Sequence, residues 1–452
     1  MASCVSEKTL TPLEMYCKSL PDVADAPQHF PMYTVASAVL LKLTTLRPHE
    51  EMKARDELVV FSDDMGRAAF VSHQWLTKHH PDPQLSQMRI LQDAVQRLLT
   101  SRSESVSLDL LTEALVRPAR PLPMQEFQKQ PLFFWYDYFS CPQPEQCEPE
   151  ERDGQLARQL QAIDSIPAYV AKCHFFLALC PVLESSEANQ MLTAATWSRR
   201  GWCRVERAAR ELSRNSTWIL IQSTTSMEVV GTAMSFPPGT VAEGEFTFAR
   251  DRQKLAPVMR HIVLRKLNQL LKAGDLPAFR RHFNLQTVHL RGLETEPLGG
   301  FLPSSQGQGT VSEFLHQNGL RSVTRADSAG WRPLHYAALA GNTVVLSGLL
   351  EQPADVNKRT SQDEPMLGLP RWMSALDLAA HYKHRAATKL LLAAKAHIEG
   401  GVLPAIHYAG NADDAEGVRL LHVAAGQLQP RNSALGVSCF ESAAGHGASE
   451  AR

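Results

Sequence analysis

Apolar runs alternate with helical stretches between residues 59 and 222. Four predominantly apolar runs, each four or five residues long, occupy 67–71, 132–136, 175–179 and 218–221. Between them, apolar side chains recur every three or four positions, as in the stretch 84–100, which is the spacing of one helix face. Strands that alternate with helices build a parallel sheet with right-handed crossovers. We therefore predict an α/β parallel-sheet domain over 58–225, after an extension at 1–57 and before a linker at 226–262.

Polar side chains follow several of these apolar runs. Ser72, His73 and Trp75 come directly after the first run, and Gln143 follows the second after a short interval. Ligand sites of parallel sheets lie at the carboxyl ends of the strands, so these residues predict a binding crevice there. Ordinary caps and turns would place the same residue types at the same positions. The pattern by itself leaves both interpretations open.

The C-terminal part follows a different pattern, in which short helices form pairs. In the best-defined pair, Gly330 supplies a turn and Pro333 fits the first helical position, where a missing N–H costs nothing. Leu334 and Ala337 are compact enough for close helix packing, and Gly341 suits the left-handed end of the first helix. A second apolar helix follows directly. This segment therefore predicts a helix–turn–helix unit that needs neighbours to bury its apolar face.

The same helix-pair theme recurs twice downstream. Leu376 and Ala379 belong to the second occurrence, and Ile406 and His407 belong to the third. The theme resembles the ankyrin repeat, and the resemblance implies an all-α ankyrin-repeat solenoid that binds a protein partner on its concave face. We expect the array to span 263–452, and its clearest repeats are 327–357, 372–399 and 401–433.

The repeats also depart from the family pattern. Leu376 follows Leu334 by 42 residues, against about 33 in the family, which predicts a loop insertion over 358–371. The second unit lacks the glycine that ends the first helix, so we expect local irregularity there. The His335 and His407 side chains are expected to hydrogen-bond to neighbouring turns and so to tie the repeats together.

Four segments of the N-terminal part, taken in order, resemble the fungal heterokaryon-incompatibility (HET) domain, which is itself similar to Toll/interleukin-receptor (TIR) domains. They are Phe70-Val71-Ser72-His73-Gln74-Trp75, the stretch 134–143, the helix and strand pattern at 159–179, and Arg200-Gly201-Trp202-Cys203-Arg204-Val205-Glu206. The last segment also resembles the Trp-Cys-x-x-Glu of TIR domains that cleave NAD, and this implies that Glu206 is the catalytic carboxylate. The resemblance further implies that the side chains available to bind NAD are Ser72, His73, Trp75, Gln143 and Trp202.

A carboxylate suits NAD cleavage, because breaking the nicotinamide–ribose bond creates an oxocarbenium-like centre. The alternative is an exposed ion pair between Glu206 and Arg210, four residues apart on a helix, worth ~0.3–0.5 kcal/mol, with Trp202 in the core. Many TIR-like domains are adaptors that assemble without catalysis. We therefore expect a signalling or scaffold protein whose α/β domain self-associates. A TIR-type NAD hydrolase regulated by the repeats is the alternative.

The composition narrows the classes of partner. A net charge of −1 at pH 7 provides no global field that would recruit nucleic acid or an anionic membrane. No apolar run reaches the ~18 residues of a membrane span, and the first residues lack a signal-peptide pattern. The eight cysteines include no C-x-x-C pair, so we expect reduced thiols in a cytoplasmic protein. A zinc site formed by Cys141, Cys147 and a nearby histidine is the alternative, but these residues lack the spacing of a zinc finger. We therefore expect no metal.

Overall fold

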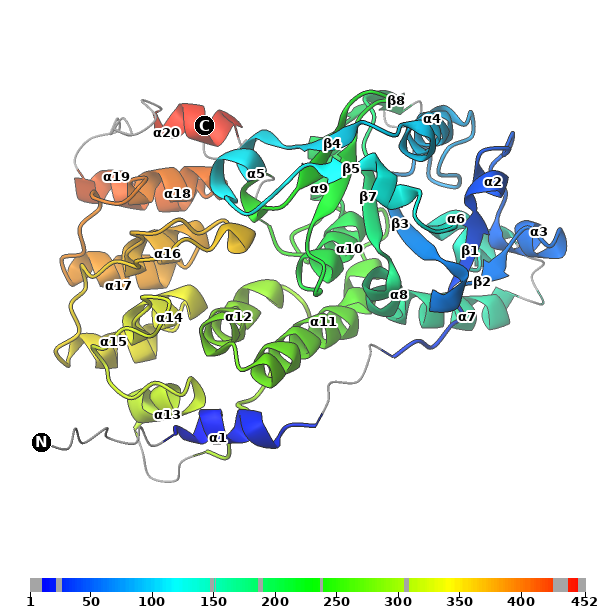
Figure 1. Cartoon of the computed structure of the whole chain (residues 1–452). Helices are drawn as coiled ribbons and strands as arrows, with labels where there is room; N and C mark the ends of the chain where they lie inside the picture. Colours follow the sequence, from blue (N-terminus) through cyan, green and yellow to red (C-terminus); the bar gives the residue numbers. More distant parts are fainter. Residues whose placement is uncertain are drawn as a thin grey trace, which may run out of the picture.

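The computed structural model describes residues 10–21, 27–146, 150, 152–185, 190–235, 239–304, 309–425 and 438–445. A mixed sheet with helices on both faces occupies one side of the molecule, and a stack of short helices occupies the other (Figure 1). Two longer helices, α11 (Asp251–Ala273) and α12 (Leu276–His289), lie between these two parts.

In the described part of the chain, nine strands form one sheet in the order β2-β1-β6-β3-β7-β10-β11-β4-β5. The strands are β1 (Tyr33–Ala36), β2 (Val59–Val60), β3 (Arg67–His73), β4 (Ser105–Leu108), β5 (Leu122–Pro123), β6 (Leu132–Tyr136), β7 (Phe175–Leu179), β10 (Trp218–Ile221) and β11 (Met227–Val230), and a separate antiparallel pair is formed by β8 (Leu183–Ser185) and β9 (Gln190–Leu192). The neighbours β6, β3, β7 and β10 are parallel, and Phe70 lies opposite Trp135 and Phe176. These four strands are the four apolar runs of the sequence, so the prediction of an α/β part with parallel strands is confirmed.

The outer strands make the sheet mixed rather than wholly parallel. β1 is antiparallel to both β2 and β6, and β11 is antiparallel to β10. On the far side, β4 is parallel to β11 and β5 is antiparallel to β4. β1 belongs to the segment 1–57 and β11 to the segment 226–262, which we predicted as an extension and a linker. The sheet therefore continues beyond both ends of the predicted domain 58–225.

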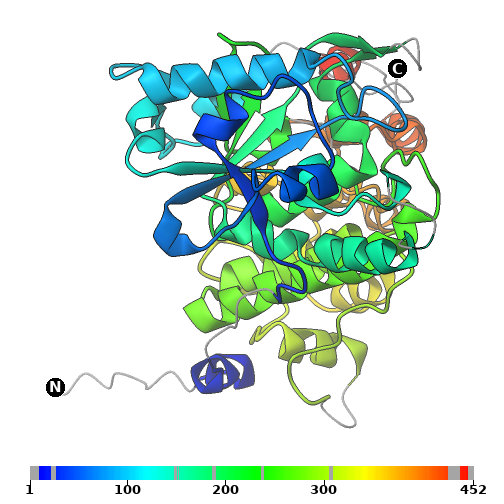
Figure 2. The ribbon, with the colours of Figure 1, turned by 90° about the vertical axis from the view of Figure 1, so that its right-hand side faces the viewer.

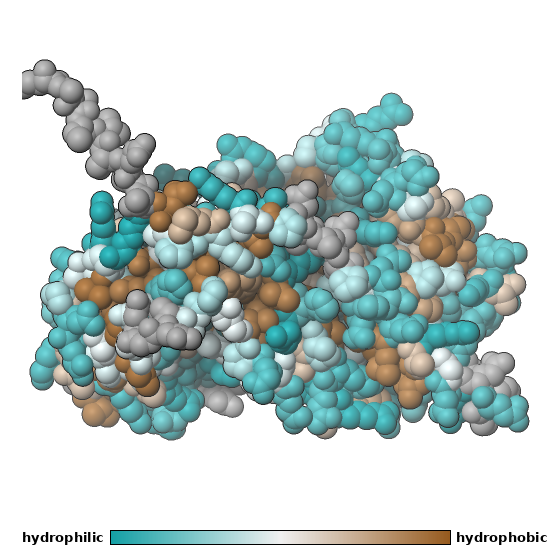
Figure 3. Space-filling view, turned by 90° about the horizontal axis from the view of Figure 1, so that it is seen from below, coloured by the Kyte–Doolittle hydropathy of each residue, from teal (hydrophilic) through white to brown (hydrophobic). Residues whose placement is uncertain are grey.

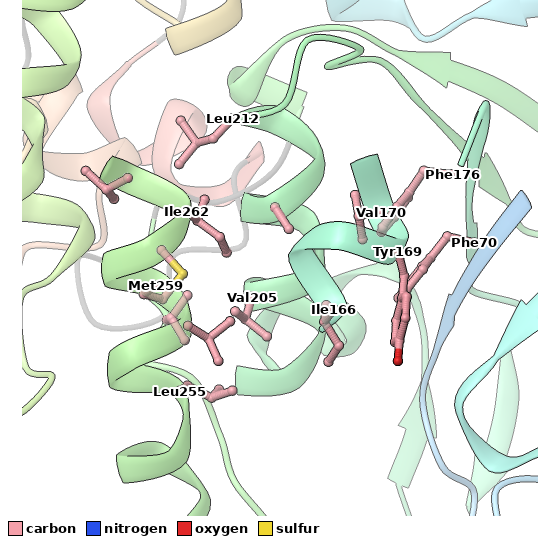
Figure 4. Packing of buried hydrophobic residues seen from close by; sticks show 14 of the residues in the cluster. Phe70, Ile166, Tyr169, Val170, Phe176, Val205, Leu212, Leu255, Met259 and Ile262 are labelled. Atoms are coloured by element: carbon pink, nitrogen blue, oxygen red, sulfur yellow. The ribbon is translucent and has the colours of Figure 1, made fainter. Parts of the chain in front are cut away.

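Helices cover both faces of this sheet. They are α2 (Ser37–Leu40), α3 (His49–Ala54), α4 (Ser86–Thr100), α5 (Leu110–Leu115), α6 (Asp137–Ser140), α7 (Arg152–Asp164), α8 (Ile166–Lys172), α9 (Ala194–Arg199) and α10 (Gly201–Glu211), joined by short 3-10 turns that include η4 (Ala233–Ser235). Because side chains alternate along a strand, Ala69 and Val71 pack towards α4, whereas Phe70 packs towards α8 and α10. Figure 2 shows α4 on one side of the sheet and α11 on the other. Figure 4 shows the apolar cluster that contains Phe70. This cluster continues through Val205 of α10 to Met259 of α11.

The C-terminal helices form two rows. They are α13 (Thr310–Gln317), α14 (Pro333–Ala340), α15 (Thr343–Leu350), α16 (Ala375–His381), α17 (Arg385–Ala393), α18 (Ala405–Asn411), α19 (Ala415–Ala425) and α20 (Cys439–Gly445), with η5 (Pro365–Leu367) in a loop. In one row α12, α14, α16, α18 and α20 pack in succession, and in the other α13, α15, α17 and α19 do so (Figure 1). The helix pair predicted between Pro333 and Leu350 is confirmed. Residues 426–437 and 446–452, which complete the third predicted repeat and the array, lie outside the described residues.

The first helix of each pair is followed by a residue with left-handed backbone. Gly341 has φ 67°, and the equivalent Lys383 and Asp413 have φ 58° and 54°. The second unit lacks the glycine that the repeat pattern favours, yet its backbone takes the same turn. A residue with a side chain adopts this conformation at a cost of about 1 kcal/mol, which the packing of α16 and α17 must offset.

The predicted insertion at 358–371 connects the helix stack to the rest of the molecule. Its turn η5 packs against η4 of the α/β part. The hydroxyl of Thr232 donates a 2.6 Å hydrogen bond to the carbonyl of Pro365. Arg281 of α12 forms a 2.8 Å ion pair with Glu364, and both side chains are largely buried. The extra residues of the second unit thus hold the stack against its neighbours.

An N-terminal helix, α1 (Pro12–Ser19), packs at the open end of the stack against α11 and α13. Leu13 is fully buried beside Gly319, and Glu14 forms a 2.9 Å ion pair with Arg321. Figure 3 views this end of the molecule, where groups of apolar residues lie among polar ones, mainly on the side of the helix stack. Within the described residues, no helix combines the length and the hydropathy needed to cross a membrane.

Candidate functional site

The carboxyl ends of β3 and β6 bring together a histidine and an aspartate. The two strands are neighbours, so His73 at the end of β3 meets Asp137 directly after β6. The Nε2 of His73 lies 2.8 Å from one carboxylate oxygen of Asp137, and the indole N–H of Trp75 donates to the other at 2.9 Å. The ring of Tyr136 stacks on the imidazole of His73 with centroids 3.9 Å apart. Tyr136 therefore fixes one face of the His73 imidazole, and Asp137 fixes its Nε2 edge.

These partners keep Asp137 ionised. Burial acts to raise the pKa of Asp137, but the charge and hydrogen bond of His73 and the hydrogen bond of Trp75 outweigh it, so the pKa is lowered from its ordinary value. The Asp137 side chain is still 33% exposed, whereas that of His73 is 2% exposed. Asp137 is thus the solvent-facing member of the pair.

Glu206 lies on α10 and points into the same region from the other side. It is 8% exposed, and the hydroxyl of Ser72 donates a 2.5 Å hydrogen bond to its carboxyl group. The same hydroxyl accepts a 3.0 Å hydrogen bond from the indole N–H of Trp197. Burial raises the pKa of Glu206 to about 8, an effect that the Ser72 hydrogen bond reduces and the nearby charge of Asp137 reinforces. Glu206 is therefore mainly protonated at neutral pH.

The alternative of an exposed ion pair between Glu206 and Arg210 is wrong. The Arg210 guanidinium donates instead to the backbone carbonyls of Cys173, His174 and Thr217, at 2.8–3.0 Å. Arg210 is 2% exposed, so both residues are buried, and each has its own partners outside α10. The spacing of four residues on a helix suggested a pair, but the neighbouring strands provided other partners for each side chain.

Two thiols near Glu206 are not activated as nucleophiles. Cys203 contacts the carbonyl of His73 with Sγ···O 3.5 Å, and Cys141 is also buried. Burial, followed by nearby carboxylates that include Glu206, raises the pKa of both thiols well above the ordinary range. Among the described residues, no group of three or more His, Cys, Asp or Glu side chains is placed to hold a metal ion.

The other predicted ligand-binding residues divide into two groups. The side-chain amide of Gln143 donates to the carbonyl of Cys141 at 3.0 Å and lies 3.4 Å from that of Asp137, so it supports the loop after β6. Trp202 lies elsewhere, because its indole N–H donates to Asp251 of α11 at 3.3 Å and its ring packs on the core cluster. The structure thus collects Ser72, His73, Trp75, Gln143 and Glu206 in one region and leaves Trp202 outside it.

Asp137 and Trp197 complete this region but were not among the predicted site residues. Asp137 had a signal in the sequence, since it follows an apolar run within the segment that resembles the HET motif. Trp197 had none, because it precedes the Arg-Gly-Trp segment without a recognisable pattern. The resulting site holds two carboxyl groups whose environments move their pKa values in opposite directions, which is the arrangement of a general acid and a base.

The signature residues of the predicted repeats lie at helix ends, in turns and at buried packing positions of the helix stack. Pro333 begins α14, and the buried side chains at the repeat positions are Leu334, Ala337, Leu376, Ala379, Ile406 and His407. The Nδ1 of His335 accepts a 3.0 Å hydrogen bond from the backbone N–H of Arg332, and its Nε2 lies 2.9 Å from the carbonyl of Lys358. His335 therefore ties the start of α14 to the loop after α15, as predicted. Gly330 has φ 79°, which fits its role in the turn.

Comparison with known proteins supports one part of this organisation. No curated protein matches the chain. Residues 329–361 match the family model of the ankyrin repeat, a unit that generally mediates protein–protein interaction.

Proposed function

We propose that this protein is a scaffold that binds a protein partner through an ankyrin array and carries the α/β part as a TIR/HET-like effector or assembly domain. The observation that carries the proposal is the recurrence of the matched helix pair α14–α15 as α16–α17 and α18–α19. Each pair keeps a left-handed residue after its first helix. Leu334, Leu376 and Ile406 are each at most 3% exposed, as stacked repeats require.

The packing of the stack favours one face for the partner. Helices α14, α16 and α18 lie towards α12 and the α/β part, while α15, α17 and α19 form the outer row (Figure 1). The inner row is partly covered by contacts such as the 2.7 Å hydrogen bond from Arg291 to the carbonyl of Tyr382. Val344 on α15 and Val423 on α19 are 64% and 80% exposed. We place the partner on this outer row, where apolar side chains are available, instead of on the concave face that the resemblance implied.

The test uses matched exposed valines. Peptides selected by display against the full chain are measured for affinity to wild type, Val344→Asp and Val182→Asp. Val182 is 59% exposed in the α/β part, so it controls for the loss of an exposed valine. The expected result is at least a tenfold weaker affinity for Val344→Asp and an unchanged affinity for Val182→Asp. Equal affinities, or no selected peptide, would remove the outer row as the partner surface.

A second function, cleavage of NAD, is favoured by the position of Glu206. Its carboxyl group shares the strand-end region with Ser72, His73 and Asp137, as a site resembling that of TIR enzymes would need. Deprotonated Glu206 would stabilise the positive charge that develops on the ribose when nicotinamide leaves. TIR-like enzymes generally act as assemblies, so the α/β part would self-associate for this reaction.

The assay is nicotinamide release from NAD by full-length protein at high concentration. Wild type is compared with Glu206→Gln, which keeps the shape of the side chain and removes the charge. Glu184→Gln, an exposed change on β8, is the matched control. Loss of at least 100-fold in rate only for Glu206→Gln supports the function. Equal rates in all three proteins, or no release from an assembled sample, would leave a binding protein without this activity.

A further inference from the structure

A cavity of about 210 Å³ lies where the α/β part meets the helix stack. Its walls come from α10, α11, α12, the segment 239–243, the turn η5, and the ends of α16 and α18. The cavity is separate from the Glu206 site, although α10 contributes to both. Segments from both halves of the chain therefore close around one space.

Cationic side chains predominate in its wall. Those that line the cavity are Arg204, Arg207, Lys266, Arg291 and Lys383, against the carboxylates Glu211 and Glu243. The two carboxylates are already engaged: Glu211 lies 3.5 Å from Arg207, and Glu243 lies 3.4 Å from Arg291. In the described part of the chain, no salt bridge is formed by Arg204, Lys266 or Lys383. The wall thus carries more cationic than anionic side chains, although Glu243 and Glu245 lie near enough to Arg204 to favour its charged form.

Burial makes this excess of positive charge energetically unfavourable unless an anion lies nearby. Burial, assisted by the charge of Arg207, lowers the pKa of Arg204 to about 10. Burial likewise lowers the pKa of Lys266, although Asp275 opposes the effect. A nearby anion would stabilise both charged forms and offset the loss of hydration.

Several buried polar atoms in the same wall have no hydrogen-bond partner. They include Nε of Arg291, Nδ1 of His282 and Nε2 of His289. Burial lowers the pKa of His289 to about 4 and that of His282 well below its ordinary value, so both rings are neutral. A buried polar atom without a partner destabilises the fold, and such atoms in native proteins generally meet a ligand or water.

The arginines are already held in place by the backbone. Arg204 donates to the carbonyls of Ser198 and Thr240 at 2.8 and 2.7 Å. Its guanidinium lies over Gly239, where a Cβ atom would be only 2.7 Å from a guanidinium nitrogen. Arg291 is fixed by its bond to the carbonyl of Tyr382 at 2.7 Å. These contacts orient the donors before any ligand arrives, which lowers the entropic cost of binding.

We propose that this cavity binds a small organic phosphate. Its phosphate group would lie among Arg204, Lys266 and Lys383, which provide charge-assisted hydrogen bonds. Its organic part would pack on apolar wall residues such as Met259 and Leu285. Because both halves of the chain form the wall, bound ligand stabilises their junction. The proposal does not depend on a partner on the outer row or on chemistry at Glu206.

The test compares two lysines that share a backbone conformation. Lys383 lines the cavity and has φ 58°, whereas Lys395 is exposed after α17, has φ 64° and does not line the cavity. Lys383→Asn and Lys395→Asn remove the same charge, and asparagine tolerates a left-handed backbone. Calorimetry on the full chain measures binding of ADP, glucose 6-phosphate, pyrophosphate and adenosine. Thermal unfolding without ligand checks that both variants fold.

The expected result is saturable binding of ADP or glucose 6-phosphate, weakened about tenfold or more by Lys383→Asn and unchanged by Lys395→Asn. Lys266→Gln should weaken the same binding. Tighter binding of ADP identifies a nucleotide site, and tighter binding of glucose 6-phosphate identifies a sugar-phosphate site. Adenosine binding as tightly as ADP, equal effects of the two asparagine variants, or no binding of ADP or glucose 6-phosphate would overturn the proposal, even if pyrophosphate binds.

Discussion

Replacing Glu206 by glutamine should stabilise the protein at alkaline pH. Burial raises the pKa of Glu206 from 4.5 to about 8, so the folded protein keeps a proton that the unfolded chain releases. Between these two pH values the chain takes up a proton when it folds. The free energy of unfolding therefore falls as the pH rises from about 4.5 to about 8. At ~1.4 kcal/mol for each pH unit in this window, the loss is about 5 kcal/mol. Glutamine can accept the Ser72 hydrogen bond and has no charge to desolvate, so it escapes this loss.

The assay is urea denaturation of wild type and Glu206→Gln between pH 4 and 9. Other titrating groups contribute equally to both proteins, so the difference in unfolding free energy isolates Glu206. It should be small at pH 4.5 and favour the variant by several kcal/mol at pH 8.5. Ser72→Ala removes a hydrogen bond that lowers the pKa, so it should move the window to higher pH. A difference that does not change with pH would refute the assignment of Glu206 as a buried, protonated carboxyl group.

Three further outcomes follow from the same structure. If Glu206 acts as a carboxylate in NAD cleavage, the rate of nicotinamide release should rise with pH up to about pH 8, and a flat profile would exclude this role. Gly341→Ala should lower the unfolding free energy by about 2 kcal/mol or more, because a Cβ atom would lie 2.3 Å from the imidazole of His384. The control Gly274→Ala, at a position with φ 70° and open space around it, should lower the unfolding free energy by only about 1 kcal/mol. Equal losses for the two variants in calorimetry would contradict the steric argument. Leu334→Ala removes a 3% exposed core side chain and should cost about 3 kcal/mol in chemical denaturation, and a loss below about 1 kcal/mol would show that this repeat is not packed as described.

Local sequence was sufficient for the elements whose signals are short. Pro333 and Gly341 mark the two ends of α14 within nine residues, and a helix start and stop depend on just such local backbone preferences. The runs that became β3, β6, β7 and β10 were recognisable because strands buried on both faces are continuously apolar. The edge strands were missed, since β2 and β5 have two residues each, too few for any periodicity.

Only the tertiary structure decided the environment of each functional side chain. Glu206 has Arg210 one helical turn away, yet its partner is Ser72, 134 residues distant in sequence. A carboxyl group takes the partner that the packing of α10 on β3 provides, and no pattern within α10 encodes that contact. Lys383 shows the same limit, because its left-handed backbone follows from the packing of α16 and α17 rather than from its own preference. The chain therefore determined its helix pairs and central strands locally, whereas burial, the choice of hydrogen-bond partners and the cavity between the two halves arose from contacts across the whole fold.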